Sequence, residues 1–431
     1  MHTTLMDQDA ISTTDIDVIS ADSMITAIDK TPRAITSALL FLIGCITLLM
    51  TGFAIIMPIF PQRLQALGLG AETLALMEGA FGLGMFLFST PMGTWSGRVG
   101  RKPVLFISLA GFIVTNILLA LVNIPIFFIL IRFVEGMLIA GLMPASMAMI
   151  GDTIPLQKQG RWIGYITTAQ ATGIALGPGI GGFLAQVLGF TGPFFLSAGI
   201  ALLASLLAVF LVPETLPRQK RMVTKQPTIK SSTKRSQPRD ASFYGLIWLV
   251  GPFLLIDFGL IFTYPFVFPQ YPFFFEKVLH YSTAQYGLVI SVFGLAMAIS
   301  PLFLGRLSES LPKKLLIITG SILFGTLNAF MFIAPLYPLL LVGSALAGLG
   351  SALASPALGG IYLGVSNEQN RGQLMGIRGS AISAAVMLGP LAQALVGHWI
   401  TAQITFAIGV ILSLALVAIA SILLKSPRQD R

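Results

Sequence analysis

The chain has 431 residues, of which 55% are hydrophobic and only 10% are charged, and its mean hydropathy is +0.86. A soluble domain carries about 25% charged residues, so this composition excludes an ordinary soluble protein and indicates a membrane protein. The single cysteine, Cys45, excludes an intrachain disulfide, and the scattered histidines His2, His280 and His398 predict no metal site. The net charge of +9 does not predict a nucleic-acid partner, because in a membrane protein the placement of charges matters more than their sum.

Twelve apolar segments follow one another along the chain, each close to the length of one membrane-spanning helix. A polar tail, residues 1–34, precedes them; it has no secretory signal pattern and is expected to be disordered and cytoplasmic. The first six spans are predicted at 35–59, 72–93, 103–122, 125–150, 162–187 and 192–212. The second six are predicted at 244–268, 283–304, 314–334, 336–361, 374–397 and 402–424.

A basic, polar segment, residues 213–243, separates the two sets and is expected to be a solvated cytoplasmic linker. The predicted domains are therefore a six-helix bundle at 35–212, a second at 244–425 and a short cytoplasmic tail at 426–431. A helix satisfies its own backbone hydrogen bonds in lipid. The predicted fold is therefore an all-α membrane protein with twelve transmembrane helices in two six-helix bundles.

The placement of lysine and arginine predicts the orientation in the membrane. If the amino terminus is cytoplasmic, all but three of the 26 basic residues fall in the tails and the cytoplasmic loops. The exceptions are Arg63 and Lys277 on the outer side and Arg132 within a span. By the positive-inside rule, both termini are expected to face the cytoplasm.

The two halves share residues at a constant offset of 212 positions, which indicates an internal duplication with pseudo-symmetry. The matches are Phe81–Leu83 with Phe293–Leu295, Gly93 with Gly305, Pro144 with Pro356, Gly160 with Gly372, and Leu176–Pro178 with Leu388–Pro390. Two duplicated six-helix bundles resemble the architecture of the major facilitator transporters, and this resemblance implies a substrate cavity between the two halves near the middle of the bilayer.

The loop after the second span, GTWSGRVGRK, is rich in glycine and basic residues: Gly93, Arg98, Gly100, Arg101 and Lys102. It resembles the G-x3-D-R-x-G-R-R/K loop of the major facilitator superfamily, except that Gly97 stands at the acidic position. The corresponding loop of the second half keeps an acid, Glu309. In the family this acid holds the cytoplasmic side closed through a charge-assisted bond, so Glu309 is expected to bear more of that role. The alternative is that the basic residues only anchor the topology.

The fourth span carries Arg132, Glu135 and Gly136 in IRFVEGMLIAG. This resembles the R-x-x-Q-G segment of the family, with Glu135 at the position of the glutamine. Inserting an arginine into the membrane costs about 2.5–3.5 kcal/mol, so Arg132 should face the cavity and find a partner. Glu135, one helical turn away, is the expected partner. The resemblance implies a role in proton coupling for Arg132; the alternative is a structural pair that neutralises itself.

The fifth span reads GYITTAQATGIALGPGIGG and has the spacing G-x8-G-x3-G-P-x2-G-G, formed by Gly164, Gly173, Gly177, Pro178, Gly181 and Gly182. It is similar to the antiporter signature on the fifth helix of the drug:proton antiporters of the superfamily. The glycines let another helix approach backbone to backbone, and the proline should bend the helix. We expect this face to form the tight seam at which the two halves pack and reorient.

Two further carboxylates lie within predicted spans, Glu78 in the second and Asp257 near the middle of the seventh. Burial disfavours the charged form of a carboxylate, so such a group can take up a proton on one side and release it on the other. The first span has no acid. If protons drive transport, their carriage therefore falls to Asp257, Glu135 or Glu78. For Glu78 the alternative is an acid near the membrane interface.

The segment after Asp257, residues 262–275, is unusually aromatic. Aromatic rings bind lipophilic or cationic compounds by dispersion and cation–π contacts. Phe258, Phe262 and Tyr264 are deep enough to be expected in the substrate cavity, whereas the other rings fit an interfacial belt.

Over about residues 35–425, the chain resembles the twelve-span drug:proton antiporters of the tetracycline and multidrug efflux type. The resemblance implies a secondary transporter, not an enzyme, that exports a small amphipathic compound in exchange for protons by alternating access. It also implies a monomer in a bacterial cytoplasmic membrane, with a small-molecule substrate, protons and the lipid bilayer as partners and with no cofactor, metal or nucleic acid. The alternatives are proton-coupled uptake of a sugar or metabolite, and a non-transporting sensor or lipid-handling protein on the same fold.

Overall fold

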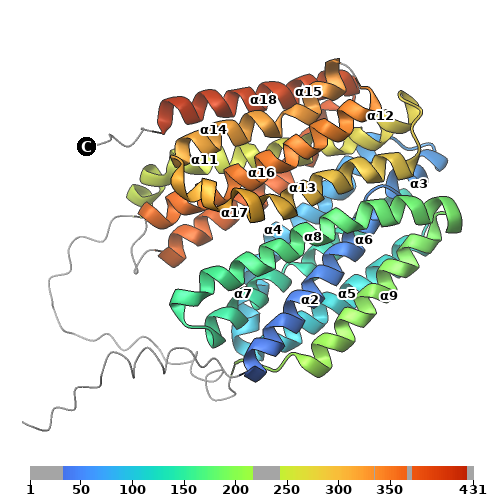
Figure 1. Cartoon of the computed structure of the whole chain (residues 1–431). Coiled ribbons are helices and arrows are strands. Elements are labelled where there is room, and N and C mark those ends of the chain that lie inside the picture. The colour runs from blue at the N-terminus through green and yellow to red at the C-terminus, as the bar shows by residue number, and fades with distance from the viewer. Residues whose placement is uncertain (1–32, 217–242, 334, 366–370, 425–431) are drawn as a thin grey trace, which may run out of the picture.

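The computed structural model describes residues 33–216, 243–333, 335–365 and 371–424, and the regular secondary structure in these ranges is helical throughout. The predictions for the tail up to residue 32, for linker residues 217–242 and for the carboxyl-terminal tail lie outside the described residues. We refer to residues 33–216 as the first half and to residues 243–424 as the second half. The end of the molecule at which the first helix begins and the last helix ends is called the terminal end (Figure 1).

The first half consists of eight helical segments: α2 (Arg33–Ile56), α3 (Phe60–Ala66), α4 (Ala71–Val99), α5 (Arg101–Leu121), α6 (Pro125–Ile139), α7 (Leu142–Thr153), α8 (Leu156–Leu188) and α9 (Thr191–Leu211). The second half consists of nine: α11 (Phe243–Val267), η2 (Phe268–Gln270), α12 (Tyr271–Lys277), α13 (Thr283–Ser310), α14 (Lys313–Phe324), α15 (Thr326–Ile333), α16 (Tyr337–Val365), α17 (Arg371–Val396) and α18 (Ala402–Leu423).

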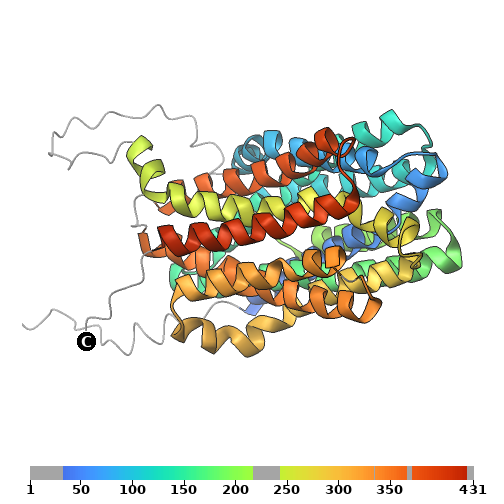
Figure 2. The same cartoon turned by 90° about the horizontal axis from the view of Figure 1, so that it is seen from above.

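Several short segments join end to end, so that the described residues contain twelve helices long and apolar enough to cross a membrane. This confirms the predicted number of spans and the all-α fold. The ends differ from those predicted, since the first span continues to Ala66 rather than to 59, and the seventh continues to Lys277 rather than to 268. The helices run roughly parallel to one long direction, with the two halves side by side (Figures 1 and 2).

Local chemistry explains where individual helices begin and end. Pro125 stands at the first position of α6, where its missing N–H costs no hydrogen bond. The side chain of Thr401 accepts a hydrogen bond of 3.3 Å from Ile404 N and caps α18. Gly100 separates α4 from α5 with φ of 126°, a conformation that favours glycine. The loop glycine is thus required by the turn itself.

Small residues let helices approach closely within each half and across the boundary between them. A Cβ added at Gly294 of α13 would lie 2.5 Å from Ala175 N of α8, and one added at Gly82 of α4 would lie 2.7 Å from Met387 Cα of α17. Gly82 and Gly294 are related by the offset of 212, and so are Ala175 and Met387. The two halves therefore meet at two seams, α8 with α13 and α4 with α17, which obey the internal pseudo-symmetry.

Candidate functional site

A cavity of about 910 Å³ lies between the two halves. Residues from α2, α4, α6, α7 and α8 form its first-half wall, and residues 375–383 of α17 form the facing wall. In α4 the lining extends from Phe81, near the middle of the helix, to Thr94, near its terminal end. At that end Met147 and Met375 are exposed. The cavity thus begins in the middle of the bundle and opens toward the terminal end.

The lining is mostly apolar, and the part that the structure describes has no charged side chain. Its polar groups are hydroxyls and one amide, contributed by Ser89, Thr90, Thr94, Gln170, Ser380 and Ser383. Sites for small molecules typically combine an apolar, concave lining with a few polar groups in this way, and they measure about 300–1,000 Å³. The cavity is large enough for a drug-sized molecule.

A charged cluster lies beside the closed end of this cavity. Arg132 of α6 donates through Nη1 to Glu135 Oε2 at 3.0 Å and through Nη2 to Glu78 Oε1 of α4 at 2.6 Å. The side chain of Glu135 is fully buried, whereas that of Glu78 is 23% exposed. The structure thus brings together the predicted pair and adds Glu78, whose contact with Arg132 sequence reasoning did not foresee. One guanidinium serves two carboxylates.

Aromatic rings separate the charged cluster from the cavity. The guanidinium carbon of Arg132 lies 4.6 Å from the centroid of the Phe81 ring and 5.4 Å from that of Phe53. Both rings also line the cavity. Stacking on the rings adds cation–π attraction to the two ion pairs. Phe53 and Phe81 thus lie between Arg132 and the cavity and are in contact with both.

A second charged pair lies in the other half. Asp257 of α11 is 2% exposed and accepts hydrogen bonds from Nε and Nη2 of Arg378 in α17, the latter at 3.3 Å. The Arg378 guanidinium also lies 5.2 Å from the centroid of the Tyr362 ring. Sequence reasoning missed Arg378 by counting it among the cytoplasmic charges. Arg378 lies inside the apolar segment 374–397, and this position could have indicated a buried charge. Arg378 is thus a fourth basic residue that departs from the predicted charge asymmetry.

The three aromatic residues expected in the cavity lie elsewhere. Phe262 stacks between Phe258 and Phe266 along α11, with ring centroids 5.6 Å and 5.7 Å away. Tyr264 stacks on Phe293 at 5.8 Å and lines a separate cavity of only about 10 Å³. The described lining of the central cavity includes none of the three, so their part in substrate binding stays a prediction. Phe258, Phe262 and Tyr264 instead pack against other aromatic rings of the second half.

The glycine motif of the fifth span packs against two different helices. Cβ atoms added at Gly173, Gly177 and Gly181 would lie 2.7–2.8 Å from backbone atoms of Thr51 and Ile55 in α2. One added at Gly182 would lie 2.7 Å from Thr283 O of α13, and the carbonyl of Pro178 lies against Gly287 of the same helix. Gly164 is exposed and has no such neighbour within 4 Å.

The seam with the second half thus lies on the face that carries Pro178 and Gly182, and not on the face that carries Gly177. Gly177 does not face the second half but α2 of its own half, because it shares a helix face with Gly173 and Gly181, at a spacing of four residues. Only the adjacent face, with Gly182, meets α13. The motif supports packing inside the first half as much as packing between the halves.

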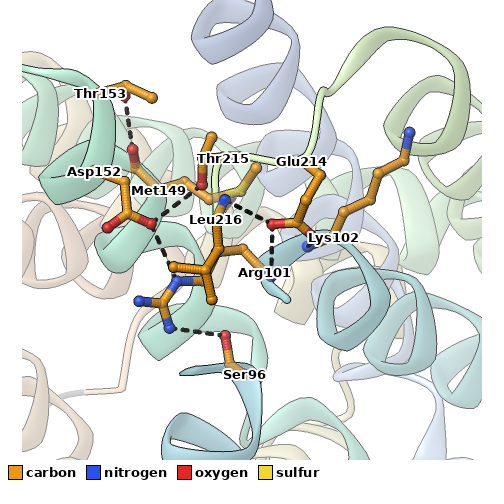
Figure 3. A network of polar contacts seen from close by, with 9 residues as sticks. All are labelled: Ser96, Arg101, Lys102, Met149, Asp152, Thr153, Glu214, Thr215 and Leu216. Carbon is orange, nitrogen blue, oxygen red and sulfur yellow. Dashed lines mark hydrogen bonds and ion pairs between the residues drawn. The ribbon is translucent and has the colours of Figure 1, made fainter. Parts of the chain in front are cut away.

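The loop motif binds to its own half (Figure 3). Arg101 pairs with Asp152 at the end of α7, Nε to Oδ2 at 3.2 Å, and also donates to Ser96. The backbone N–H groups of Arg101 and Lys102 donate to the Glu214 carboxylate at 3.0 Å and 3.2 Å. A carboxylate at this position stabilises the start of α5. Asp152 and Glu214, which sequence reasoning missed, thus supply the acids that Gly97 does not.

The remaining loop residues have simpler environments. Arg98 is exposed at the end of α4, and a Cβ added at Gly93 would lie 3.4 Å from Pro144 of α7. The side chain of Glu309 lies outside the described residues, so its expected latch stays a prediction.

Polar contacts join the two halves at the end opposite to the terminal end. Gln62 of α3 donates to Thr283, Gln65 donates to Glu276 of α12, and Thr283 donates to Glu276 at 2.9 Å. Glu72 of α4 pairs with His398, which follows α17. The described ion pairs at the terminal end, such as Arg101 with Asp152, connect elements of one half. The opposite end is thus closed while the cavity opens at the terminal end.

The fold and the cavity define a multi-pass membrane transporter built from two six-helix halves. The Major Facilitator Superfamily model matches residues 42–282 and 253–431, so the chain belongs to this superfamily, which confirms the predicted resemblance. Within the described ranges, no group of three or more His, Cys, Asp or Glu side chains could hold a metal ion.

Similar proteins are known from bacteria. Multidrug resistance protein 2 of Bacillus subtilis is 27% identical over 281 residues, covering 63% of this chain and 68% of the relative. Quinolone resistance protein NorA of Staphylococcus aureus is 26% identical over 373 residues, covering 85% of this chain and 92% of the relative. The crystal structure of a D-xylose-proton symporter matches with a TM-score of 0.69 at 18% identity, covering 88% and 96% of the two chains, and shows the shared fold.

Proposed function

We propose that this protein is a drug:proton antiporter that exports amphipathic compounds by alternating access. The observation that carries the proposal is the cluster of Glu78, Arg132 and Glu135 beside a drug-sized cavity. Two carboxylates share one guanidinium, so the cluster has one more formal negative charge than positive charge, and a single added proton would neutralise it. The printed names of two relatives, a multidrug and a quinolone resistance protein, support drugs as the cargo.

Within the cluster, Glu78 is the entry point for the proton. Its side chain is 23% exposed, whereas Glu135 is fully enclosed. Oε1 of Glu135 has no hydrogen-bond partner in the described part of the chain, so a charge on it is poorly compensated. A proton that arrives at Glu78 loosens its bond to Arg132, and the guanidinium then relies more on Glu135. Since Arg132 stacks on Phe53 and Phe81, this change reaches the cavity wall.

The direction of transport follows from which end of the molecule is open and which is closed. The cavity opens at the terminal end, and the positive-inside rule assigns that end to the cytoplasm. The cargo then loads from inside the cell. Opening of the opposite end requires the contacts of Gln62, Gln65 and Glu72 with the second half to break. We place the protein in a bacterial cytoplasmic membrane, with both termini cytoplasmic, as a monomer.

The proposal is tested in inside-out membrane vesicles that contain the protein. Addition of an exported drug should release protons from energised vesicles, and dissipation of the pH gradient should stop drug accumulation. Vesicles with Glu78→Gln and Glu135→Gln together should bind the drug but not couple its movement to protons. Drug accumulation at the same rate with and without the proton gradient would overturn the proposal. Uptake of a sugar by intact cells instead of drug export would also overturn it.

A further inference from the structure

Methionine is concentrated in the lining of the central cavity. Five of the 23 lining residues are methionines, compared with 17 of 431 in the whole chain. They are Met50 of α2, Met85 of α4, Met143 and Met147 of α7, and Met375 of α17. The groove between α13 and α16, of about 560 Å³, is a useful comparison because its described lining is even more apolar, with Ser300 as its one polar side chain, and contains no methionine. The enrichment in methionine is thus found in the central cavity and not in this second apolar groove.

The methionines surround the space where a ligand would lie. Those of α2, α4 and α7 belong to the first-half wall, and Met375 faces them from α17 of the second half. Met50, Met85 and Met143 are half-buried, whereas Met147 and Met375, at the open end, are 36% and 40% exposed. Since both walls carry them, a bound molecule contacts methionine from either half.

Methionine has physical properties that suit a site for ligands of different shape. Its side chain is unbranched, rotates about three bonds and ends in a polarisable thioether, so it fills irregular gaps at little cost. Leucine has a similar volume but is branched and has fewer rotatable bonds, so the same space is filled in fewer ways. With no charged side chain in the described lining, adaptable dispersion contacts provide most of the attraction.

We propose that these five methionines determine how many different compounds the cavity accepts, by changing rotamer to fit each one. This inference deepens the proposed drug transport and rests on it for the identity of the cavity as the substrate site. The ligand class is lipophilic compounds of up to drug size, whose few polar groups reach the hydroxyls of α4 and α17.

The glycine motif contributes to the position of one of these methionines. Gly173 of α8 lies against Met50, and a Cβ added to it would also lie 2.7 Å from Thr51 N. A side chain at Gly173 would push α2 away and move Met50 relative to the cavity. Part of the function of the motif is therefore to place a lining residue.

The test compares two triple variants of the full chain, purified in lipid nanodiscs. The cavity variant carries Met85→Leu, Met143→Leu and Met375→Leu. The control carries Met77→Leu, Met149→Leu and Met331→Leu, three methionines that are at most 1% exposed and lie in the cores. Binding of Nile red, rhodamine 6G, ethidium and norfloxacin is measured by fluorescence, with thermal unfolding as a check on folding.

In the cavity variant, at least one compound should lose about tenfold in affinity while another stays within about twofold, because each ligand uses different rotamers. In the control variant, the affinities for all four compounds should change by nearly the same factor. An equal shift for all compounds in the cavity variant, or none, would overturn the proposal. If the triple variant unfolds, the single variants Met143→Leu and Met375→Leu give the same comparison.

Binding to the purified protein involves neither protons nor transport. A wild-type protein that binds the panel but does not exchange it for protons would contradict the proposed antiport and leave the methionine proposal intact. Conversely, coupled transport with a uniform response to the methionine changes would contradict only the methionine proposal.

Discussion

The two buried charged groups differ in their balance of charge. In the first half, Glu78 and Glu135 share Arg132, whereas in the second half Asp257 has Arg378 to itself. The first cluster therefore keeps one negative charge and the second keeps none. A group with an excess negative charge gains from binding a proton, whereas a matched pair must first be broken. We therefore propose that proton exchange belongs to the first half and that the pair in the second half has a structural role.

The duplication makes this difference more informative. At the offset of 212, the first cluster corresponds to Ile290, Ser344 and Ala347, and the second corresponds to Cys45 and Ile166. Neither cluster has a copy in the other half, although the seam positions Gly82 and Gly294 are both glycine. Packing positions were retained in both halves, while the charges were placed separately in each.

The largest effect is expected from removal of the shared arginine. Arg132→Met leaves two carboxylates inside the protein without a counter-charge, and breaking a buried ion pair costs about 3–5 kcal/mol. Export should fall by about 100-fold or more, and the protein should unfold at a lower temperature. Export from vesicles at matched expression measures this, with the exposed Arg98→Met as control. Unchanged export would show that the cluster has no part in transport.

The second prediction concerns the proton itself. Glu78→Gln keeps the size and polarity of the side chain but cannot titrate, so drug-induced proton release should fall about tenfold or more while drug affinity stays within about threefold. Proton release is followed with a pH-sensitive dye and binding with fluorescence. Normal proton release from this variant would move the exchange site to another residue.

The third prediction tests the matched pair. Asp257→Asn leaves Arg378 without its carboxylate and should reduce export by about tenfold through the lost pair. Adding Arg378→Gln removes the stranded charge, so the double variant should export better than Asp257→Asn alone. If Asp257 carries the proton, which is one of the three assignments that the sequence left open, the double variant should remain as inactive as the single one. Comparing the single and double variants thus decides whether Asp257 is a structural partner of Arg378 or a proton carrier.

The smallest effects are expected from glycines beside each charged group. A Cβ at Gly136 would lie 2.9 Å from Phe81 C in α4, so Gly136→Ala should separate α6 from α4 and stretch the bond between Arg132 and Glu78. A Cβ at Gly359 would lie 3.1 Å from Arg378 Nη1, the end of a flexible side chain. Gly136→Ala should therefore cost about 1–3 kcal/mol of stability, and Gly359→Ala less. Thermal unfolding compares them, and equal losses would contradict the reasoning.

Much of the architecture was predictable from the sequence alone. The length and spacing of the apolar segments determine twelve helices, because a segment of about 20 apolar residues crosses the bilayer as a helix that satisfies its own backbone hydrogen bonds. The constant offset of 212 predicted the internal symmetry, and the contact between Arg132 and Glu135 follows from their spacing on one helix. These are local properties or repeats, and each can be derived without knowing which helices are neighbours.

Other features depended on which helices pack together. Arg378 and Asp257 are 121 positions apart, and Glu78 reaches Arg132 from another helix, so helical periodicity could predict neither contact. The glycine pattern predicted close approach but not that Gly177 faces α2, and the aromatic run did not reveal that its rings pack within the second half. Periodicity determines a helix and its faces. Which face meets which neighbour is decided by the packing of all helices at once, and only the tertiary structure contains that information.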